Sequence, residues 1–284
     1  MKENQQKTLY ELLQECEEKQ QQEITHIPTF NQSLDEVLQG GIPLGEVSQI
    51  VGFPGIGKSQ LSMQLCCNYQ WIENQENNNL NECIYFDSGY NCSGKRLEEM
   101  ISSLLSSNTN ETETENQNDL NEIQTKRIKQ ILKKISIQYP NDLIALLANI
   151  IALERESKTI KLIIIDSITT FFKKTTYETN IKLQTIQTLM QHLSSLAQKK
   201  NCAIVIVNHL TTKEIERNYT AISFDKKNEY SFSFTKTLGV SFSCYIHLTF
   251  YLFQLPDQTE IIVHSSDSFI NHRIPFTITQ HGFM

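Results

Sequence analysis

The sequence predicts an α/β fold with a mostly parallel central sheet, helices on both faces of that sheet, and antiparallel strands added at its C-terminal edge. Three observations predict this fold. Short apolar runs typical of strands buried on both faces alternate along the chain with helical patterns. A glycine-rich loop lies between the first of these runs and the next helical pattern. After Gly239 the alternation ends, and apolar segments separated by turn residues follow.

The parallel part of the sheet is predicted from apolar runs at residues 47–51, 83–86, 162–165 and 203–207. Helical periodicity separates these runs at residues 60–71, 142–155 and 181–199. Strands that alternate with helices pair in parallel, because each connecting helix returns the chain to the same end of the sheet. The late strands are predicted at residues 245–253, 260–264 and 275–279.

Polar stretches suggest the domain organisation. Residues 1–25 are rich in Gln and Glu and carry one short apolar stripe, so we expect a linker or arm ahead of a single core at residues 26–284. Two stretches near residues 73–82 and 102–122 are crowded with Asn, Glu, Ser and Thr. We interpret both as surface insertions, the second without regular structure. The alternative for both is a functional acidic contact surface.

Charge and cysteine content limit the classes of function. The formal net charge of −7 provides no global positive field, so any nucleic-acid binding requires a local basic surface. Seven cysteines without a CxxC pair or a secretory leader predict reduced thiols in an intracellular protein. Cys66 and Cys67 are expected to be core residues of a helix. No apolar run reaches the roughly 18 residues that a transmembrane helix needs, so no membrane partner is expected.

The glycine-rich loop has the GxxxxGK[ST] pattern and the strand-loop-helix context that gives this pattern meaning. It reads Gly52, Phe53, Pro54, Gly55, Ile56, Gly57, Lys58 and Ser59, and Gln60 follows. Backbone N–H groups of such a loop face a polyphosphate at the positive end of the next helix. Lys58 would reach the β- and γ-phosphates, and the Ser59 hydroxyl would ligate Mg²⁺. The loop therefore predicts a site for ATP and Mg²⁺.

A second carboxylate is expected near the metal. Asp166 ends the apolar run 162–165, at the carboxyl end of the predicted sheet, where open α/β folds bind ligands. We interpret Asp166 as the residue on the metal side of the site. The alternative is an Asp that caps the helix after the strand.

With both elements assigned, the chain resembles the RecA-like strand-exchange recombinases of archaea and eukaryotes, most closely the C paralogue of the eukaryotic recombinase. The resemblance extends from about residue 8 to the end. It rests on the approach segment 33–46 with its Gly-Gly-Ile-Pro turn, the loop helix 59–65, the segment 208–213 (NHLTTK) and the closing segment 277–283. It implies a RecA-like P-loop NTPase core.

The resemblance also implies roles for individual residues. Lys58, Ser59 and Asp166 match the family's nucleotide and magnesium residues, and Arg96 matches an arginine that lies against the adenine. Segments 170–180 and 211–238 correspond to two DNA-facing loops. In the second loop, basic residues alternate with aromatic ones, which suits a phosphate backbone and stacked bases. The DNA-binding candidates are Lys213, Arg217, Lys226, Lys227 and Lys236. An ordinary solvated loop is the alternative.

The departures from the family concern hydrolysis. Family members that hydrolyse ATP carry Asp-Thr-Glu-Gly after the second core strand, and this Glu activates the attacking water. Here Gly89 occupies the Glu position, and loss of a general base typically costs about 10²–10⁴ in rate. Asp87 is the candidate for a substitute, but it lies closer to the strand than the Glu position, so no catalytic residue is assigned. His209 aligns with the family's γ-phosphate-sensing glutamine, and Cys244 lies near the position of a histidine that reaches the neighbouring protomer.

Three functional hypotheses follow. The first is an ATP-binding recombinase paralogue in DNA repair by homologous recombination in the nucleus, with weak or absent hydrolysis. Its expected partners are other recombinase paralogues or the main recombinase, and single-stranded DNA, bound weakly by this chain alone. Residues 1–25 match only the family's linker, so the small helical domain that precedes the core in relatives is expected to be missing. The second hypothesis is an active DNA-dependent ATPase that forms filaments and exchanges strands. The third is a small-molecule kinase, which does not account for the long second loop.

Overall fold

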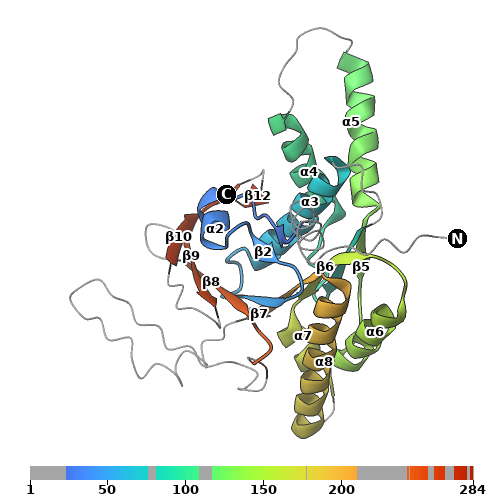
Figure 1. The fold of residues 1–284 in the computed structure, drawn as a ribbon, viewed down its shortest axis with the longest axis vertical. Coiled ribbons are helices and arrows are strands. Elements are labelled where there is room, and N and C mark those ends of the chain that lie inside the picture. Colours follow the sequence, from blue (N-terminus) through green and yellow to red (C-terminus); the bar gives the residue numbers. More distant parts are fainter. Residues whose placement is uncertain are drawn as a thin grey trace, which may run out of the picture.

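The computed structural model describes residues 24–75, 81–108, 117–176, 178–209, 242, 244–254, 259–265, 272–279 and 282–283. Within these residues, eight strands form the central sheet in the order β10-β9-β8-β3-β7-β6-β4-β5 (Figure 1). The strands are β3 Val47–Gly52, β4 Glu82–Asp87, β5 Ile135–Gln138, β6 Ile160–Asp166, β7 Ala203–His209, β8 Leu248–Gln254, β9 Thr259–Ser265 and β10 His272–Phe276.

The sheet is mixed in the way that the sequence predicts. Strands β8, β3, β7, β6, β4 and β5 pair in parallel with their neighbours, whereas β9 is antiparallel to β8 and β10 is antiparallel to β9. The predicted fold class is therefore confirmed. Two details differ from the prediction: β8 continues the parallel part of the sheet, and the short edge strand β5 was missed.

Helices connect the strands and cover the sheet on both faces. They are α2 Gln32–Val37, α3 Lys58–Gln75, α4 Gly94–Asn108, α5 Gln117–Leu132, α6 Leu143–Arg155, α7 Ile168–Lys174 and α8 Thr179–Lys200. Local chemistry sets their ends. The side chain of Asp142 accepts a hydrogen bond from the Ala145 N–H at 2.8 Å and caps the start of α6. Helix α8 stops at Asn201, which has the left-handed conformation common at helix C-termini.

Strand residues divide the core into two layers, because successive side chains point to opposite faces of the sheet. In β6, Leu162 and Ile164 pack toward α3 and α4, whereas Ile163 and Ile165 pack toward α6, α7 and α8. Figure 1 shows α6, α7 and α8 below the sheet, with α3 and α4 on the opposite side. Cys66 and Cys67 are fully buried in α3, which confirms their predicted core role.

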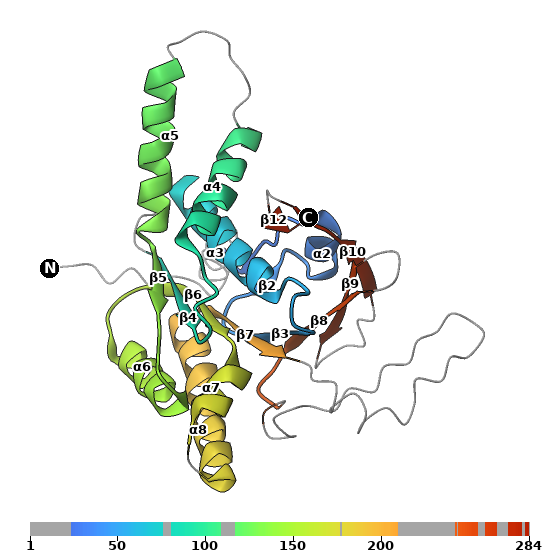
Figure 2. The ribbon, with the colours of Figure 1, turned by 180° about the vertical axis from the view of Figure 1, so that it is seen from behind.

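Two predicted surface insertions contain more order than the sequence suggested. In the stretch 102–122, residues up to Asn108 complete α4 and residues from Gln117 begin α5, so the expectation of no regular structure was wrong at both ends. Figures 1 and 2 show α4 and α5 extending side by side from the body. In the stretch 73–82, Glu73 is buried and accepts hydrogen bonds from Tyr69 Oη (2.6 Å) and Asn81 Nδ2 (2.9 Å). The sequence analysis placed Glu73 in a surface insertion because it is polar, but the fold buries it and provides two hydrogen-bond donors for its carboxylate.

Two small sheets complete the described structure. Strand β1 (His26–Ile27) pairs with β2 (Ile42–Pro43), and β11 (Ile278–Thr279) pairs with β12 (Gly282–Phe283). The β11–β12 hairpin brings the end of the chain against α3, close to α2, as Figure 2 shows from behind. Across the described ranges, none of the helices has the length and apolar character required to span a membrane. Most of the predicted arm, residues 1–23, lies outside the described residues.

Candidate nucleotide-binding site

The glycine-rich loop connects β3 to α3, which begins at Lys58. Lys58 is only 4% exposed, and its Nζ donates hydrogen bonds to the backbone oxygens of Gly52 (2.9 Å) and Phe53 (2.6 Å). Burial lowers the pKa of Lys58 to about 8, and the negative charge of Asp166 opposes part of this shift. The loop therefore holds a partly desolvated cation at the N-terminus of a helix, an arrangement suited to a phosphate group.

Gly57 is required by the shape of this loop. Its φ of 104° lies in the region that L-amino acids rarely adopt, and a Cβ at this position would lie 2.0 Å from Cδ1 of Ile278. Gly55 also has a positive φ, of 82°, but a Cβ there would meet no atom within 4 Å. The terminal hairpin thus packs directly onto the loop at one glycine and leaves the other open.

Asp166 lies at the carboxyl end of β6 and is buried. Its Oδ2 accepts a hydrogen bond from the Tyr85 hydroxyl at 2.7 Å, and its carboxylate also bonds to the Ser59 side chain. Burial raises the pKa of Asp166, and these two hydrogen bonds oppose that rise. The fold therefore brings the Ser59 hydroxyl and the Asp166 carboxylate together, as the predicted magnesium site requires.

The alternative role of Asp166 as a helix cap does not hold, because Ser167 is the N-cap of α7. Within the described part of the chain, no group of three or more His, Cys, Asp or Glu side chains could hold a metal ion by itself. This donor set still fits Mg²⁺, which usually takes one or two carboxylates and completes its octahedron with water and phosphate oxygens.

The loop after β4 contains the position where the family's catalytic glutamate is expected. Gly89 is exposed there, and a Cβ added to it would lie 2.4 Å from Nδ2 of Asn91. Asp87 is buried, and its two oxygens accept backbone hydrogen bonds from Gly89 N (3.0 Å) and Cys92 N (2.8 Å). The Asp87 carboxylate thus organises the turn of this loop.

His209 ends β7 and pairs in register with Gly52 at the start of the glycine-rich loop. Its Nδ1 is buried and has no hydrogen-bond partner among the described residues. Burial lowers the pKa of His209 to about 4, and the positive charges of Lys58 and Lys173 lower it further. The ring is therefore neutral near pH 7 and offers an unused nitrogen beside the loop.

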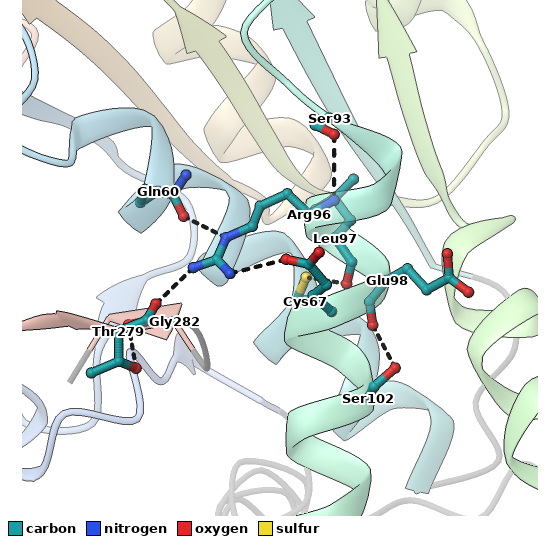
Figure 3. A network of polar contacts seen from close by, with 10 residues as sticks. Gln60, Cys67, Ser93, Arg96, Leu97, Glu98, Ser102, Thr279 and Gly282 are labelled. Carbon is teal, nitrogen blue, oxygen red and sulfur yellow. Dashed lines mark hydrogen bonds and ion pairs between the residues drawn. The ribbon is translucent and has the colours of Figure 1, made fainter.

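Arg96 on α4 connects three elements around the site. Figure 3 shows its guanidinium reaching Gln60 on α3 and the backbone of Thr279 in β11. Nε donates to Gln60 Oε1 at 2.9 Å, Nη2 donates to Thr279 O at 2.8 Å, and Nη1 pairs with Glu99 Oε2 at 3.2 Å. Arg96 therefore lies beside the first turn of the loop helix, and it also anchors the terminal hairpin.

Comparison with known proteins identifies the family. The Rad51 family model matches residues 20–228, which is more than half of the chain. This chain belongs to the Rad51 family. It is similar to "DNA repair protein RAD51 homolog 3" of Dictyostelium discoideum, with 27% identity over 90% of this chain and 65% of the relative. The protein of the same name from Cricetulus griseus is 28% identical over 90% of this chain and 68% of its own length.

These relatives confirm the resemblance to the C paralogue, and the chain spans about two thirds of their length. A solved structure, described as the crystal structure of the RadB recombinase, has the same fold with a TM-score of 0.63 and 18% identity. The match covers 90% of this chain and 98% of the RadB chain. The RecA-like architecture predicted from the sequence is therefore confirmed.

Of the two segments that resemble DNA-facing loops of the Rad51 family, the structure describes most of the first and none of the second. The second lies outside the described residues, together with all five basic candidates in it, Lys213, Arg217, Lys226, Lys227 and Lys236. The first segment, residues 170–180, is largely helical, because α7 continues to Lys174 and α8 begins at Thr179. Both termini of this segment are thus tied to helices of the core.

Sequence reasoning missed several residues of this Rad51-family site. Tyr85 lies one strand away from Asp166, and Ile278 and Thr279 come from the far end of the chain. Tyr85 could have been suspected, because it precedes Asp87 by two residues and so points to one defined face of a predicted strand. Nothing in the local sequence around residue 278 indicates contact with a loop more than two hundred residues earlier.

Proposed function

We propose that this chain is an ATP-binding recombinase paralogue that acts in DNA repair by homologous recombination in the nucleus. It works through complexes with other recombinase paralogues or the main recombinase, and with single-stranded DNA. The proposal is supported by its membership of the Rad51 family and by the names of its relatives, which are DNA repair proteins. The observation that carries it is the convergence of Lys58, Ser59 and Asp166 at the carboxyl edge of the sheet.

ATP is held by residues 52–60, with Arg96 on the side of the base. Lys58 neutralises the β- and γ-phosphates, and Ser59 and Asp166 support Mg²⁺ directly or through water. The buried nitrogen of His209 lies at the β7 end of this site, beside Gly52. When ATP binds only to the folded state, it stabilises that state by about 2.7 kcal/mol at one hundred times its Kd. The nucleotide thus acts as a structural ligand for an assembly module, the core at residues 26–284, with residues 1–25 as an arm.

Hydrolysis by this module is weak or absent. Gly89 provides no carboxylate, and the Asp87 carboxylate already accepts two backbone hydrogen bonds. To act as a general base, Asp87 would have to release at least one of them and leave a backbone N–H without its partner. A missing general base lowers the rate by about 10²–10⁴.

Turnover and affinity measured together test this proposal. We expect ATP to bind the wild type with negligible turnover, with or without single-stranded DNA, and to bind Lys58→Ala much more weakly. DNA-stimulated turnover by the wild type would instead favour a filament-forming ATPase. Gly89→Glu tests whether the missing glutamate at this position is the cause of the negligible ATP turnover. Gly89→Ala is the matched control, because it adds only the Cβ. Asn91 must shift its amide for either variant, which is a small movement of a flexible side chain.

Partner binding is tested separately by co-purification with the main recombinase and with recombinase paralogues, in the presence of ATP or ADP. We expect a stable complex that requires ATP and is lost in Lys58→Ala. A chain that binds ATP but forms no such complex would contradict the assembly role.

A further inference from the structure

Two exposed tyrosines stack on each other at the carboxyl edge of the sheet. Tyr90 follows β4 and Tyr139 follows β5, and these strands are parallel neighbours, so both residues emerge at the same edge. Their ring centroids are 5.0 Å apart with an interplanar angle of 17°. Tyr90 is 72% exposed and Tyr139 is 46% exposed. The stacked pair is therefore accessible to solvent and lies outside the two core clusters.

The backbone holds Tyr90 in a conformation that a free chain would avoid. Its φ is 57°, in the left-handed region, which costs a non-glycine residue roughly 1–2 kcal/mol. The Asp87 carboxylate fixes the turn on both sides of Tyr90, through Gly89 N and Cys92 N. The loop that lacks the family's glutamate is thus well organised, and what it displays is an aromatic ring.

Tyr139 is restrained as well. It is followed by the buried Pro140, which limits the backbone of the preceding residue to extended conformations. A rigid aromatic side chain loses little conformational entropy when a planar ligand stacks on it. Because the backbone of both tyrosines is restrained, stacking a planar ligand on them costs less conformational entropy than stacking it on a ring in a mobile segment.

Positive charge lies next to the pair in an otherwise acidic protein. Nζ of Lys174 lies 5.6 Å from the centroid of the Tyr90 ring and donates a hydrogen bond to Ser88 O at 2.6 Å. Lys173 is the other basic residue in the last turn of α7, and both lysines are exposed. A single hydrogen bond leaves donors on the Lys174 ammonium for an anionic group.

We propose that Tyr90 and Tyr139, flanked by Lys174, form a base-stacking platform for single-stranded nucleic acid. This inference rests on the proposed function and extends it, because it assigns a DNA contact to Tyr90 and Tyr139, which lie outside the two DNA-facing segments of the resemblance. Lys174 belongs to the first of these segments, residues 170–180. Bases of any sequence have a face that stacks on tyrosine, while lysine neutralises the phosphates. The residues flanking the two rings include the exposed Gly89, Asn91 and Asn141, and the asparagine amides can hydrogen-bond to bases or phosphates.

The test is fluorescence anisotropy with the full chain and two labelled strands of equal length, one oligothymidylate and one abasic. The two strands carry the same phosphates, so only the first reports stacking. We expect Tyr90→Ala and Tyr139→Ala to weaken oligothymidylate binding about fivefold or more, and Tyr90→Phe to stay within about twofold. Binding of the abasic strand should change less than about twofold in all three variants. Ile123→Ala, which truncates an exposed apolar residue on α5, is the control and should change neither.

Salt dependence separates the roles of the charges and the rings. Lys174→Ala should weaken binding of both strands and reduce the slope of log K against log salt by about 0.7, whereas Tyr90→Ala should leave the slope unchanged. Equal losses on both strands, or no loss in the tyrosine variants, would overturn the stacking platform. ATP affinity of each variant is measured in parallel. Absence of oligothymidylate binding by a wild type that binds ATP would overturn the platform and leave the nucleotide-binding module standing.

Discussion

The lowered pKa of Lys58 predicts that the protein takes up protons when it binds ATP. Burial brings this pKa from 10.5 to about 8, so the neutral amine makes up about one tenth of the free protein at pH 7, about half at pH 8 and about nine tenths at pH 9. Bound phosphates favour the ammonium form, because an adjacent negative charge stabilises a cation. Each ATP bound at pH 8 should therefore bring with it about half a proton, and at pH 9 close to one.

The assay is isothermal titration calorimetry at each pH in two buffers with different enthalpies of ionisation. The difference between the observed enthalpies gives the number of protons taken up. Lys58→Arg is the matched control, because arginine stays charged throughout this range and should show no uptake. His209 does not interfere: its pKa of about 4 must rise by several units before it contributes, and any uptake at that residue declines above neutral pH.

Two results would refute this reasoning. One is an enthalpy independent of buffer between pH 8 and 9 in the wild type. The other is equal uptake by the wild type and Lys58→Arg. The lowered pKa of Lys58 also affects the stability of the free protein. Because this pKa is lower in the folded state than in the unfolded state, the unfolded state binds more protons between pH 8 and 10.5. In this window the Lys58 contribution should make stability rise with pH.

Three further predictions use other features of the site. Gly57→Ala should destabilise the protein by about 1–3 kcal/mol in denaturant unfolding, more than Gly55→Ala, because only the first meets Ile278; equal losses would contradict the contact. Asp166→Asn should raise the melting temperature of the free protein, because burial disfavours the carboxylate and raises its pKa. The same variant should lose the extra stabilisation that Mg²⁺ gives in the presence of ATP. An unchanged response to Mg²⁺ would exclude Asp166 from the metal site. Arg96→Ala should cost about 1.5–3 kcal/mol, as expected for hydrogen bonds made by a charged group, and expose the terminal hairpin to limited proteolysis; wild-type resistance to cleavage would show that the hairpin is held by its packing on α3.

Much of the fold could be predicted because it is recorded in local patterns. Buried parallel strands are mostly apolar, so β3, β4, β6 and β7 were found from composition alone. Strand β5 was missed because only Ile135 of its four residues is buried and polar residues alternate with the two isoleucines, which leaves no apolar run to recognise. Helices α4 and α5 were partly taken for disorder because polar residues dominate the sequence at the end of α4 and at the start of α5.

The sequence by itself determined which chemical groups the site contains. It establishes a phosphate-binding loop with Lys58 and Ser59, an aspartate at the end of a core strand, and a glycine in place of a glutamate at residue 89. These follow from spacing along the chain and need no knowledge of neighbours.

Only the tertiary structure decided how these groups behave, because burial and long-range contacts depend on the order of strands in the sheet. It buries Lys58 and so lowers its pKa, and it occupies the Asp87 carboxylate with two backbone hydrogen bonds. It also sets β4 beside β5, which stacks Tyr90 on Tyr139 across forty-eight residues of intervening sequence. Pairing of parallel strands brings their carboxyl ends to one edge, and that edge is where the separate signals of this sequence become one site.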